Sequence, residues 1–498
     1  MKKKMLSLVL SLTLILGLCA CSAPKADMGL GSAAPSPSYD AGNRESYTEI
    51  VESGFVSTAT SPSSYFSIDA NTASYPNLRR LITGGSTGIP KDAVRIEEML
   101  NYFDYDYETP TDGSVLSLTS SVFDTPYNPN TKLMCIGLAA EKVDFSGVRN
   151  NLVFLLDVSG SMYSDDKLPL VQQAFTMLAE NLNPEDRVSI VTYAGSDAVL
   201  LSGAYGYEKQ KIIAVIEDLT AGGSTAGSRG IQTAYQLAEQ YFIEGGNNRV
   251  ILATDGDFNV GTVTNIGLEA LISAKRESGV YFSVYGFGTG NLKSDKMETL
   301  ALKGNGTYSY IDSVKEARKA LVEGIGGSIV TVAKDVKAGI TFNPEYVSSY
   351  RLVGYENKLL TEEEFNNSNT DAGELGSGHT VTVVYEIVMT DKALEAGESI
   401  ADVVIKYKPT ENVGADATTE RELTLTVGTE SYHEQLTKTD AFVASVVEFA
   451  LILRKSGYKA NANLDAVAQR LASIDLSDDE FKAEFAELVN IYIENLSK

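Results

Sequence analysis

Residues 152–161 read LVFLLDVSGS, five consecutive apolar side chains followed by an aspartate and two serines. An uninterrupted apolar run of this length is typical of a β-strand that is covered on both faces, as in a parallel sheet. In open α/β sheets, ligands bind at the carboxyl ends of the strands. The segment therefore predicts a buried parallel strand whose following loop presents Asp157, Ser159 and Ser161 at a ligand-binding edge.

The segments after this strand alternate between amphipathic helices and apolar strands. The expected helices span residues 167–182, 228–242, 266–278 and 314–325, and the expected strands span 188–193, 249–254 and 280–287. Strands that alternate with helices of this length form βαβ units, which build a mainly parallel sheet. The predicted fold class is α/β, with a doubly wound, mainly parallel sheet over residues 149–327.

The regions on either side of this domain predict further β-structure. Residues 328–436 hold several strand-like runs without intervening helices, which predicts a β-rich antiparallel sandwich. Residues 46–148 predict a helix at 91–103 and then strands within 114–145. We hypothesise that these strands pair with those of 328–436, so that the α/β domain interrupts a single sandwich.

The last predicted region, residues 437–498, is a helical segment. A mostly apolar helix is predicted over residues 440–455 and is expected to stop at Gly457, because glycine is common just past a helix end. The run Ser477–Glu480 predicts a capping box at the start of the final helix. Apolar residues on one face of that helix, from Phe481 to Leu496, indicate packing against a core.

The N-terminus carries the signals of an export sequence. Three lysines precede a mostly apolar run that is too short to cross a bilayer, which predicts a signal peptide over residues 1–20. Leu18-Cys-Ala-Cys21 resembles the lipobox of bacterial lipoproteins, and this resemblance implies cleavage before Cys21 and acylation (palmitate) of that residue. Ser, Ala, Pro and Gly dominate residues 21–45, which predicts a flexible tether. An ordinary secreted protein is the alternative.

The composition excludes several classes of function. Lys and Arg number 41 against 66 Asp and Glu, for a formal net charge of −25. Such a surface repels phosphate backbones, so nucleic acid is not an expected partner. Two His and three Cys leave little material for zinc or haem and exclude a disulfide scaffold.

Oxygen-bearing side chains also follow two later segments of the α/β region. The run Gly-Gly-Ser-Thr ends at Thr225 just before a helix, and the apolar strand after it ends at Asp255. With Asp157, Ser159 and Ser161, these residues make a set that suits a hard divalent cation such as Mg²⁺. Each residue alone has an ordinary explanation as a helix cap or turn residue. The joint occurrence of all five favours the metal site.

The five positions resemble the metal-ion-dependent adhesion site of the von Willebrand factor type A domain. The resemblance implies a doubly wound, Rossmann-like sheet. It also implies a bound Mg²⁺ or Mn²⁺ that leaves one coordination position for an acidic side chain of a protein ligand. Further stretches resemble bacterial lipoproteins that place a family-specific segment before this domain and a domain of unknown function after it. These stretches are residues 69–75, 79–80, 90–105 and 253–261.

The leading hypothesis is a lipid-anchored protein on the extracytoplasmic side of the cell membrane. It would bind a carboxylate of a protein partner through its metal and would not be an enzyme. The alternative is a structural or assembly scaffold of a cell-envelope complex with a purely structural metal. A metal-dependent hydrolase ranks third, because no His or Cys near the motif offers a general base or nucleophile.

Overall fold

The computed structural model describes residues 45–68, 70–111, 113–143, 147–223, 227–256, 265–323, 331–392, 395, 397–410, 413 and 419–498. The predicted signal peptide, the lipidation residue Cys21 and nearly all of the predicted tether lie outside these residues, and so does Thr225. No helix among the residues described here has the length and apolar character needed to cross a membrane.

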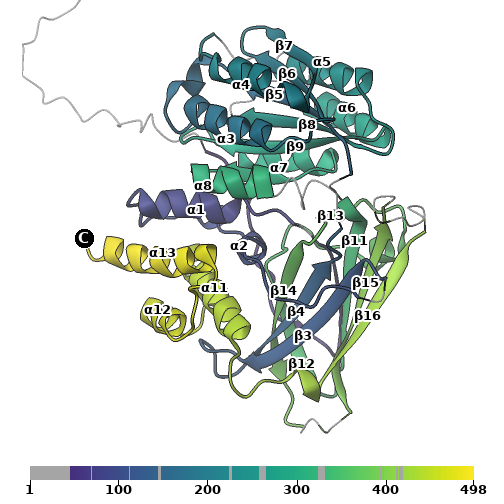
Figure 1. Cartoon of the computed structure of the whole chain (residues 1–498). Helices are drawn as coiled ribbons and strands as arrows, with labels where there is room; N and C mark the ends of the chain where they lie inside the picture. The colour runs from purple at the N-terminus through teal and green to yellow at the C-terminus, as the bar shows by residue number, and fades with distance from the viewer. Residues whose placement is uncertain are drawn as a thin grey trace, which may run out of the picture. The chain divides into compact units, whose positions relative to one another are not determined.

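The α/β region forms a six-stranded sheet in the order β10-β9-β8-β5-β6-β7. Figure 1 labels strands β5, β6, β7, β8 and β9 of this sheet. Its strands are β5 (Asn150–Asp157), β6 (Arg187–Tyr193), β7 (Asp197–Tyr205), β8 (Asn247–Thr254), β9 (Val280–Phe287) and β10 (Tyr308–Ile311). All neighbouring pairs are parallel except β6 and β7, which pair antiparallel. The sheet is therefore mainly parallel, as the sequence predicts.

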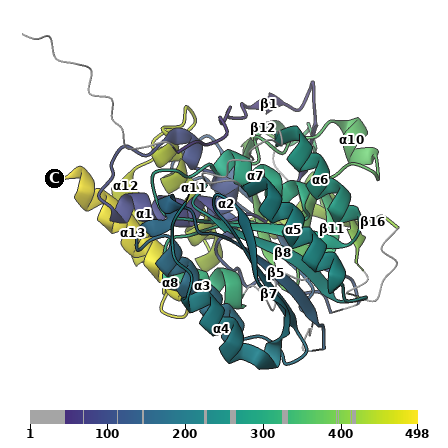
Figure 2. The same cartoon turned by 90° about the horizontal axis from the view of Figure 1, so that it is seen from above.

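Helices cover both faces of this sheet, which Figure 2 shows from above. They are α3 (Leu168–Glu180), α4 (Lys209–Glu217), α5 (Gly227–Gln240), α6 (Asn265–Glu277), α7 (Ser294–Lys303) and α8 (Val314–Ala317), which continues as a π-helix, η4 (Arg318–Glu323). The apolar run of β5 divides between the two faces: Phe154 packs with α3 and α4, and Leu155 packs with α5, α6 and α7. This double burial explains why the run has no polar interruption.

Two antiparallel sheets make up the predicted sandwich and share one core. The first has the order β1-β12-β14-β4-β3, with β1 (Val56–Ser57), β12 (Val347–Val353), β14 (Thr380–Met389), β4 (Lys132–Ala140) and β3 (Leu116–Asp124). The second has the order β13-β11-β15-β16, with β13 (Gly373–Gly376), β11 (Thr331–Phe342), β15 (Ser399–Pro409) and β16 (Arg421–Gly428), and β2 (Ser63–Ser67) also pairs with β11.

The pairing of β4 with β14 confirms that strands from both sides of the α/β domain build one sandwich. The two strands run antiparallel, and Cys135 lies opposite Val384. Cys135 is buried. Since residues 46–148 and 328–436 share a sheet, each of these predicted regions depends on the other for its hydrogen bonds. The predicted domain boundaries remain predictions.

Helices from the two ends of the described chain share a third core, in which α1 lies beside α13 (Figure 1). They are α1 (Ser74–Thr83), α2 (Ile96–Asn101), α11 (Lys438–Arg454), α12 (Leu464–Ala472) and α13 (Glu480–Leu496). Shorter elements are α10 (Glu362–Asn366) and the 3-10 turns η1 (Lys91–Ala93), η2 (Gly160–Tyr163), η3 (Gly206–Glu208) and η6 (Thr429–Ser431).

Three local predictions in these regions are wrong. The helix expected at 91–103 is split into η1 and α2, because Val94 and Arg95 are extended. Helix α11 ends with Lys455 in the left-handed conformation (φ 56°) and not at Gly457. Helix α13 is capped by Asp479, whose carboxylate accepts hydrogen bonds from two backbone N–H groups, and not by a box that starts at Ser477.

Candidate metal centre

Asp157 ends strand β5 and is completely buried. Its Oδ1 accepts a hydrogen bond from the backbone N–H of Ser159 at 2.9 Å. Its Oδ2 accepts hydrogen bonds from the Tyr193 hydroxyl at 3.1 Å and the Thr254 hydroxyl at 3.2 Å. Since β6 and β8 flank β5 and end in Tyr193 and Thr254, both neighbouring strands hold this carboxylate in place.

The two serines of the motif lie on the turn that follows. Ser159 is buried, Ser161 is partly exposed at the start of η2, and their Oγ atoms lie 3.0 Å apart. The backbone N–H of Gly160 donates to the carbonyl of Gly223 at 3.0 Å. The serine turn is therefore tied to the segment that leads into Thr225, which itself lies outside the described residues.

Asp255 follows strand β8 and is 1% exposed. Its Oδ2 lies 2.8 Å from the Nζ of Lys167 and accepts a hydrogen bond from Asn291 Nδ2 at 3.4 Å. The next residue, Gly256, has a φ of +96°, and a side chain there would collide with the backbone of residues 291–293. The sharp turn after Asp255 therefore requires glycine.

Burial sets the electrostatics of this centre. It raises the pKa of Asp157 to about 6, against the opposing effect of the hydrogen bonds from Ser159, and the nearby charge of Asp255 raises this pKa further. A buried carboxylate that is costly to ionise is stabilised by a cation placed against it. The centre is therefore an electrostatically favourable place for a positive ion.

The donor set fits a hard divalent cation. Asp157, Ser159, Ser161 and Asp255 offer two carboxylates and two hydroxyls, which are the oxygen donors that Mg²⁺ and Mn²⁺ prefer. No group of three or more His, Cys, Asp or Glu that would hold a metal occurs among the described residues. The predicted set has two carboxylates, Asp157 and Asp255, and its other ligands are hydroxyl oxygens.

The structure thus brings four of the five predicted ligands to one edge of the sheet, and the fifth is not described. Three neighbours of this centre, Lys167, Tyr193 and Thr254, were not predicted. Tyr193 and Thr254 were detectable in principle, because both end strands that flank β5. Lys167 gave no such signal, because it looks like an ordinary polar residue just before α3.

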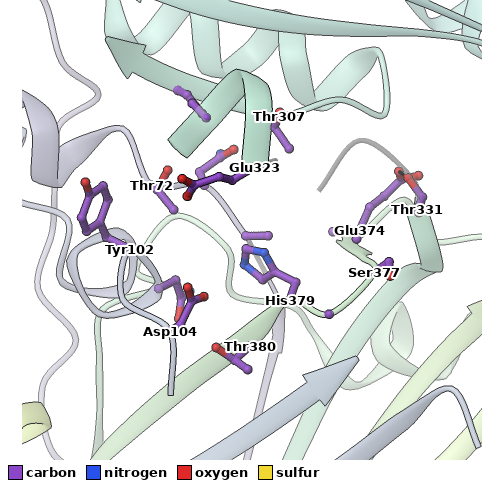
Figure 3. Close-up of a pocket in the computed structure, with 18 of the residues that line it drawn as sticks. Thr72, Tyr102, Asp104, Thr307, Glu323, Thr331, Glu374, Ser377, His379 and Thr380 are labelled. Carbon is purple, nitrogen blue, oxygen red and sulfur yellow. Dashed lines mark hydrogen bonds between the residues drawn. The ribbon is translucent and has the colours of Figure 1, made fainter. Parts of the chain in front are cut away.

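A separate cavity of about 660 Å³ lies between the α/β domain, the sandwich and the α2 region, and shares no lining residue with the metal centre. Figure 3 shows Glu323, Glu374 and His379 among its lining side chains. The Thr331 hydroxyl donates to Glu374 Oε2 at 3.0 Å. Burial raises the pKa of Glu374 to about 7, although Lys334 and the Thr331 hydrogen bond lower it.

Three family models match separate parts of the chain. Their descriptions are "von Willebrand factor" for residues 41–135, "von Willebrand factor type A domain" for 151–323 and "Uncharacterized protein YfbK, C-terminal" for 327–494. The second match confirms the predicted type A domain and includes all five predicted ligands. The third begins where the predicted sandwich begins and covers most of the predicted helical segment as well.

Individual proteins are similar over different lengths. "Uncharacterized protein YfbK" of Escherichia coli (strain K12) is 35% identical over 469 residues, which cover 89% of this chain and 80% of that protein. "UPF0353 protein" of Mycobacterium sp. (strain KMS) is 30% identical over 171 residues, 32% of this chain and 50% of that protein. Among solved structures, "von Willebrand factor type A from Catenulispora acidiphila" matches with a TM-score of 0.41 at 16% identity, over 70% of this chain and 80% of that one.

Proposed function

The chain belongs to the family of YfbK from Escherichia coli, and on that premise we propose that it is a protein-binding, adhesion-type lipoprotein. Its metal centre would engage an acidic residue of the partner. Von Willebrand factor type A domains are generally interaction modules without catalytic activity and commonly bind a divalent metal, which supports a binding role.

The observation that carries this proposal is the convergence of two buried carboxylates and two hydroxyls at the carboxyl edge of the sheet. Asp157, Ser159, Ser161, Thr225 and Asp255 would hold the Mg²⁺ or Mn²⁺ ion. The bound ion would supply a positive charge to which a carboxylate of the partner can coordinate. The protein residues hold the donor atoms in position and, by burying Asp157 and Asp255, strengthen their attraction for the ion.

The charge of the chain supports this choice of partner chemistry. A formal net charge of −25 repels acidic proteins in general. A metal ion is the largest local charge in its site and reverses the sign of the potential around it. An acidic partner residue would therefore be attracted at this centre and repelled elsewhere, which makes the contact specific.

The proposal is tested by magnesium binding and by partner capture. Asp157→Asn removes a ligand charge with little change of shape, and Asp186→Asn is its matched control. Asp186 is also a buried aspartate that accepts backbone hydrogen bonds, but it lies before β6, at the opposite edge of the sheet. We expect calorimetric Mg²⁺ binding, and chelator-sensitive capture of cell-surface proteins, for the control and the unmodified protein. Equal capture by Asp157→Asn would refute the binding role.

A purely structural metal in an assembly scaffold gives a different result in the same experiment. Chelation would then lower the melting temperature and leave partner capture in the cold intact. The depth at which Asp157 and Asp255 are buried favours this second candidate, because an ion that neutralises buried carboxylates also stabilises the fold.

The lipid anchor on Cys21 and the extracytoplasmic location are part of the proposal. Both are supported by the lipobox-like sequence and the signal-peptide pattern before it. Cys21→Ala is expected to move the protein from the membrane to the soluble fraction and to abolish labelling by a palmitate analogue. Cys135→Ala is the control, because that buried cysteine is not available for acylation. Continued membrane association of Cys21→Ala would refute the anchor.

A further inference from the structure

Lys167 is buried beside the metal centre. It is 6% exposed, and its Nζ lies 2.8 Å from Oδ2 of Asp255, which is 88 residues away in the chain. Lysine is almost never buried to this extent unless its charge is paired. The ammonium group is therefore part of the centre, and not a surface charge that happens to be near it.

The absence of a side chain at Gly288 leaves room for the stem of Lys167. A Cβ on Gly288 would lie 2.2 Å from Cγ of Lys167, so the lysine stem crosses the backbone where only glycine leaves room. Gly288 has a φ of +73°, and its carbonyl accepts a hydrogen bond from the Tyr310 hydroxyl at 2.9 Å. The backbone at Gly288, held by this hydrogen bond, thus lies against the lysine stem, whose ammonium reaches Asp255.

The charges of the centre are unequally paired. Among the residues that the structure describes, Lys167 forms an ion pair with Asp255, and no ion pair involves Asp157. Two carboxylates and one ammonium give a formal charge of −1. A divalent ion would change that charge to +1, whereas without the lysine the loaded centre would be neutral.

We infer that Lys167 is a resident counter-charge of the centre that weakens metal binding and leaves the loaded centre positive toward its partner. This inference rests on the proposed metal-dependent function and names the residue that tunes it. Before the metal binds, the ammonium compensates the buried charge of Asp255, so the fold tolerates the metal-free state. Once the metal is bound, the extra positive charge repels the ion and favours its exchange, while it strengthens the attraction for a carboxylate.

The test is Lys167→Met, which keeps the length of the stem and removes the charge. Two opposite effects are expected. Calorimetric affinity for Mg²⁺ and for Mn²⁺ rises by about tenfold or more, because a repulsive neighbouring charge has gone. The melting temperature in chelator falls by about 5 °C, because the buried Asp255 loses its ion pair with Lys167. The rise in melting temperature on adding Mg²⁺ is therefore larger in the variant than in the unmodified protein.

Lys337→Met is the matched control. Lys337 is likewise buried, and its Nζ lies 2.9 Å from Oε2 of Glu420 in the sandwich, away from the centre. It is expected to lower the melting temperature without changing the metal affinity. Lys167→Gln, which is also neutral, replaces Lys167→Met if that variant does not fold.

Each outcome has a distinct meaning. Unchanged or weaker metal binding by both neutral variants overturns the inference, because the lysine then orients Asp255 instead of opposing the ion. Absence of Mg²⁺ and Mn²⁺ binding by the unmodified protein refutes the proposed metal centre itself. Tighter metal binding together with a lower melting temperature in chelator supports the inference.

Discussion

Arg79 joins three parts of the chain, and its replacement by methionine is the sharpest test of how they hold together. Arg79 lies on α1, and its guanidinium forms a bidentate ion pair with Asp312, which follows β10. The Nε–Oδ2 distance is 2.7 Å and the Nη2–Oδ1 distance is 2.5 Å. The same group pairs with Glu316 of α8 at 2.8 Å and with Glu484 of α13 at 2.5 Å. One cation therefore links the N-terminal helices, the α/β domain and the C-terminal helices.

The expected loss of unfolding free energy follows from how deeply Arg79 and each of its partners are buried. The side chains of Arg79 and Asp312 are 7% exposed, and that of Glu316 is 2% exposed. Glu484 is 26% exposed and keeps a second cation, Lys315, at 3.1 Å, so its share is small. Leaving a buried charge without its partner costs about 3–5 kcal/mol. We therefore expect Arg79→Met to lower the free energy of unfolding by about 4 kcal/mol.

The assay is guanidinium-induced unfolding, followed through the transition in which α1, α8 and α13 unfold. Lys315→Met is the control, because that lysine is 34% exposed and pairs with the exposed Glu480 and the partly exposed Glu484, so its loss costs about 1 kcal/mol or less. A loss of less than about 1 kcal/mol for Arg79→Met would refute the reasoning, because the three carboxylates would then have found water or other partners.

The pH dependence of the stability loss in Arg79→Met tests independently whether Arg79 compensates the charge of Glu316. Burial raises the pKa of Glu316 in the folded protein, and Arg79 opposes that rise. Without the arginine, the folded-state pKa moves further above the unfolded value. Ionised Glu316 then costs stability, and the cost grows as pH rises from the unfolded pKa through the folded one. The deficit of Arg79→Met is therefore largest at pH 8 and shrinks toward pH 5. A deficit that grows on acidification would contradict this assignment.

Three further changes test other parts of the structure. Because the pKa of Glu374 is raised to about 7, Glu374→Gln should stabilise the protein in thermal unfolding at pH 8, by about 3 kcal/mol at most. The same change should have little effect at pH 4.5. Equal effects at both pH values would contradict the raised pKa. Gly288→Ala should lower the free energy of unfolding by about 1–3 kcal/mol in chemical unfolding, because it adds a Cβ at a φ of +73° against the stem of Lys167. An unchanged free energy would contradict the close contact between Gly288 and that stem. Phe485→Ala should cost about 3–5 kcal/mol in the same assay, because its fully buried ring packs against Phe103, Phe442 and other aromatic side chains; a cost below about 1 kcal/mol would contradict that packing.

The sequence pattern predicts those parts of the fold in which the residues of a single segment determine how that segment is buried. The apolar run before Asp157 must be covered on both faces wherever it lies, and the structure places it between two layers of helices. The carboxyl-edge rule then brings Asp157 and Asp255 together, because β5 and β8 are parallel neighbours. Neither step depends on knowing which distant residue will be in contact.

Tertiary contacts explain the errors. Arg95 lies within an otherwise helical pattern, yet it is extended, and its guanidinium reaches Glu298 of α7 at 3.3 Å. That ion pair connects residues about 200 positions apart, so no window of sequence reveals it. The sequence pattern does not indicate helix α1, because its arginines and Pro76 obscure the apolar spacing. Proline is tolerated there because it lies in the first turn.

The candidate metal centre likewise has features that the sequence pattern predicts and features that depend on tertiary contacts. The positions of its oxygen donors follow from strand ends, which the sequence displays. Its charge depends on Lys167, which approaches Asp255 only because the turn at Gly288 leaves the lysine stem a path. Two chains with the same five-residue motif can therefore place the same donors and still differ in metal affinity, according to which side chain lies against the last aspartate. In the proposed metal centre, the motif supplies the oxygen donors, and the residues packed around it would determine how tightly and how reversibly an ion is held.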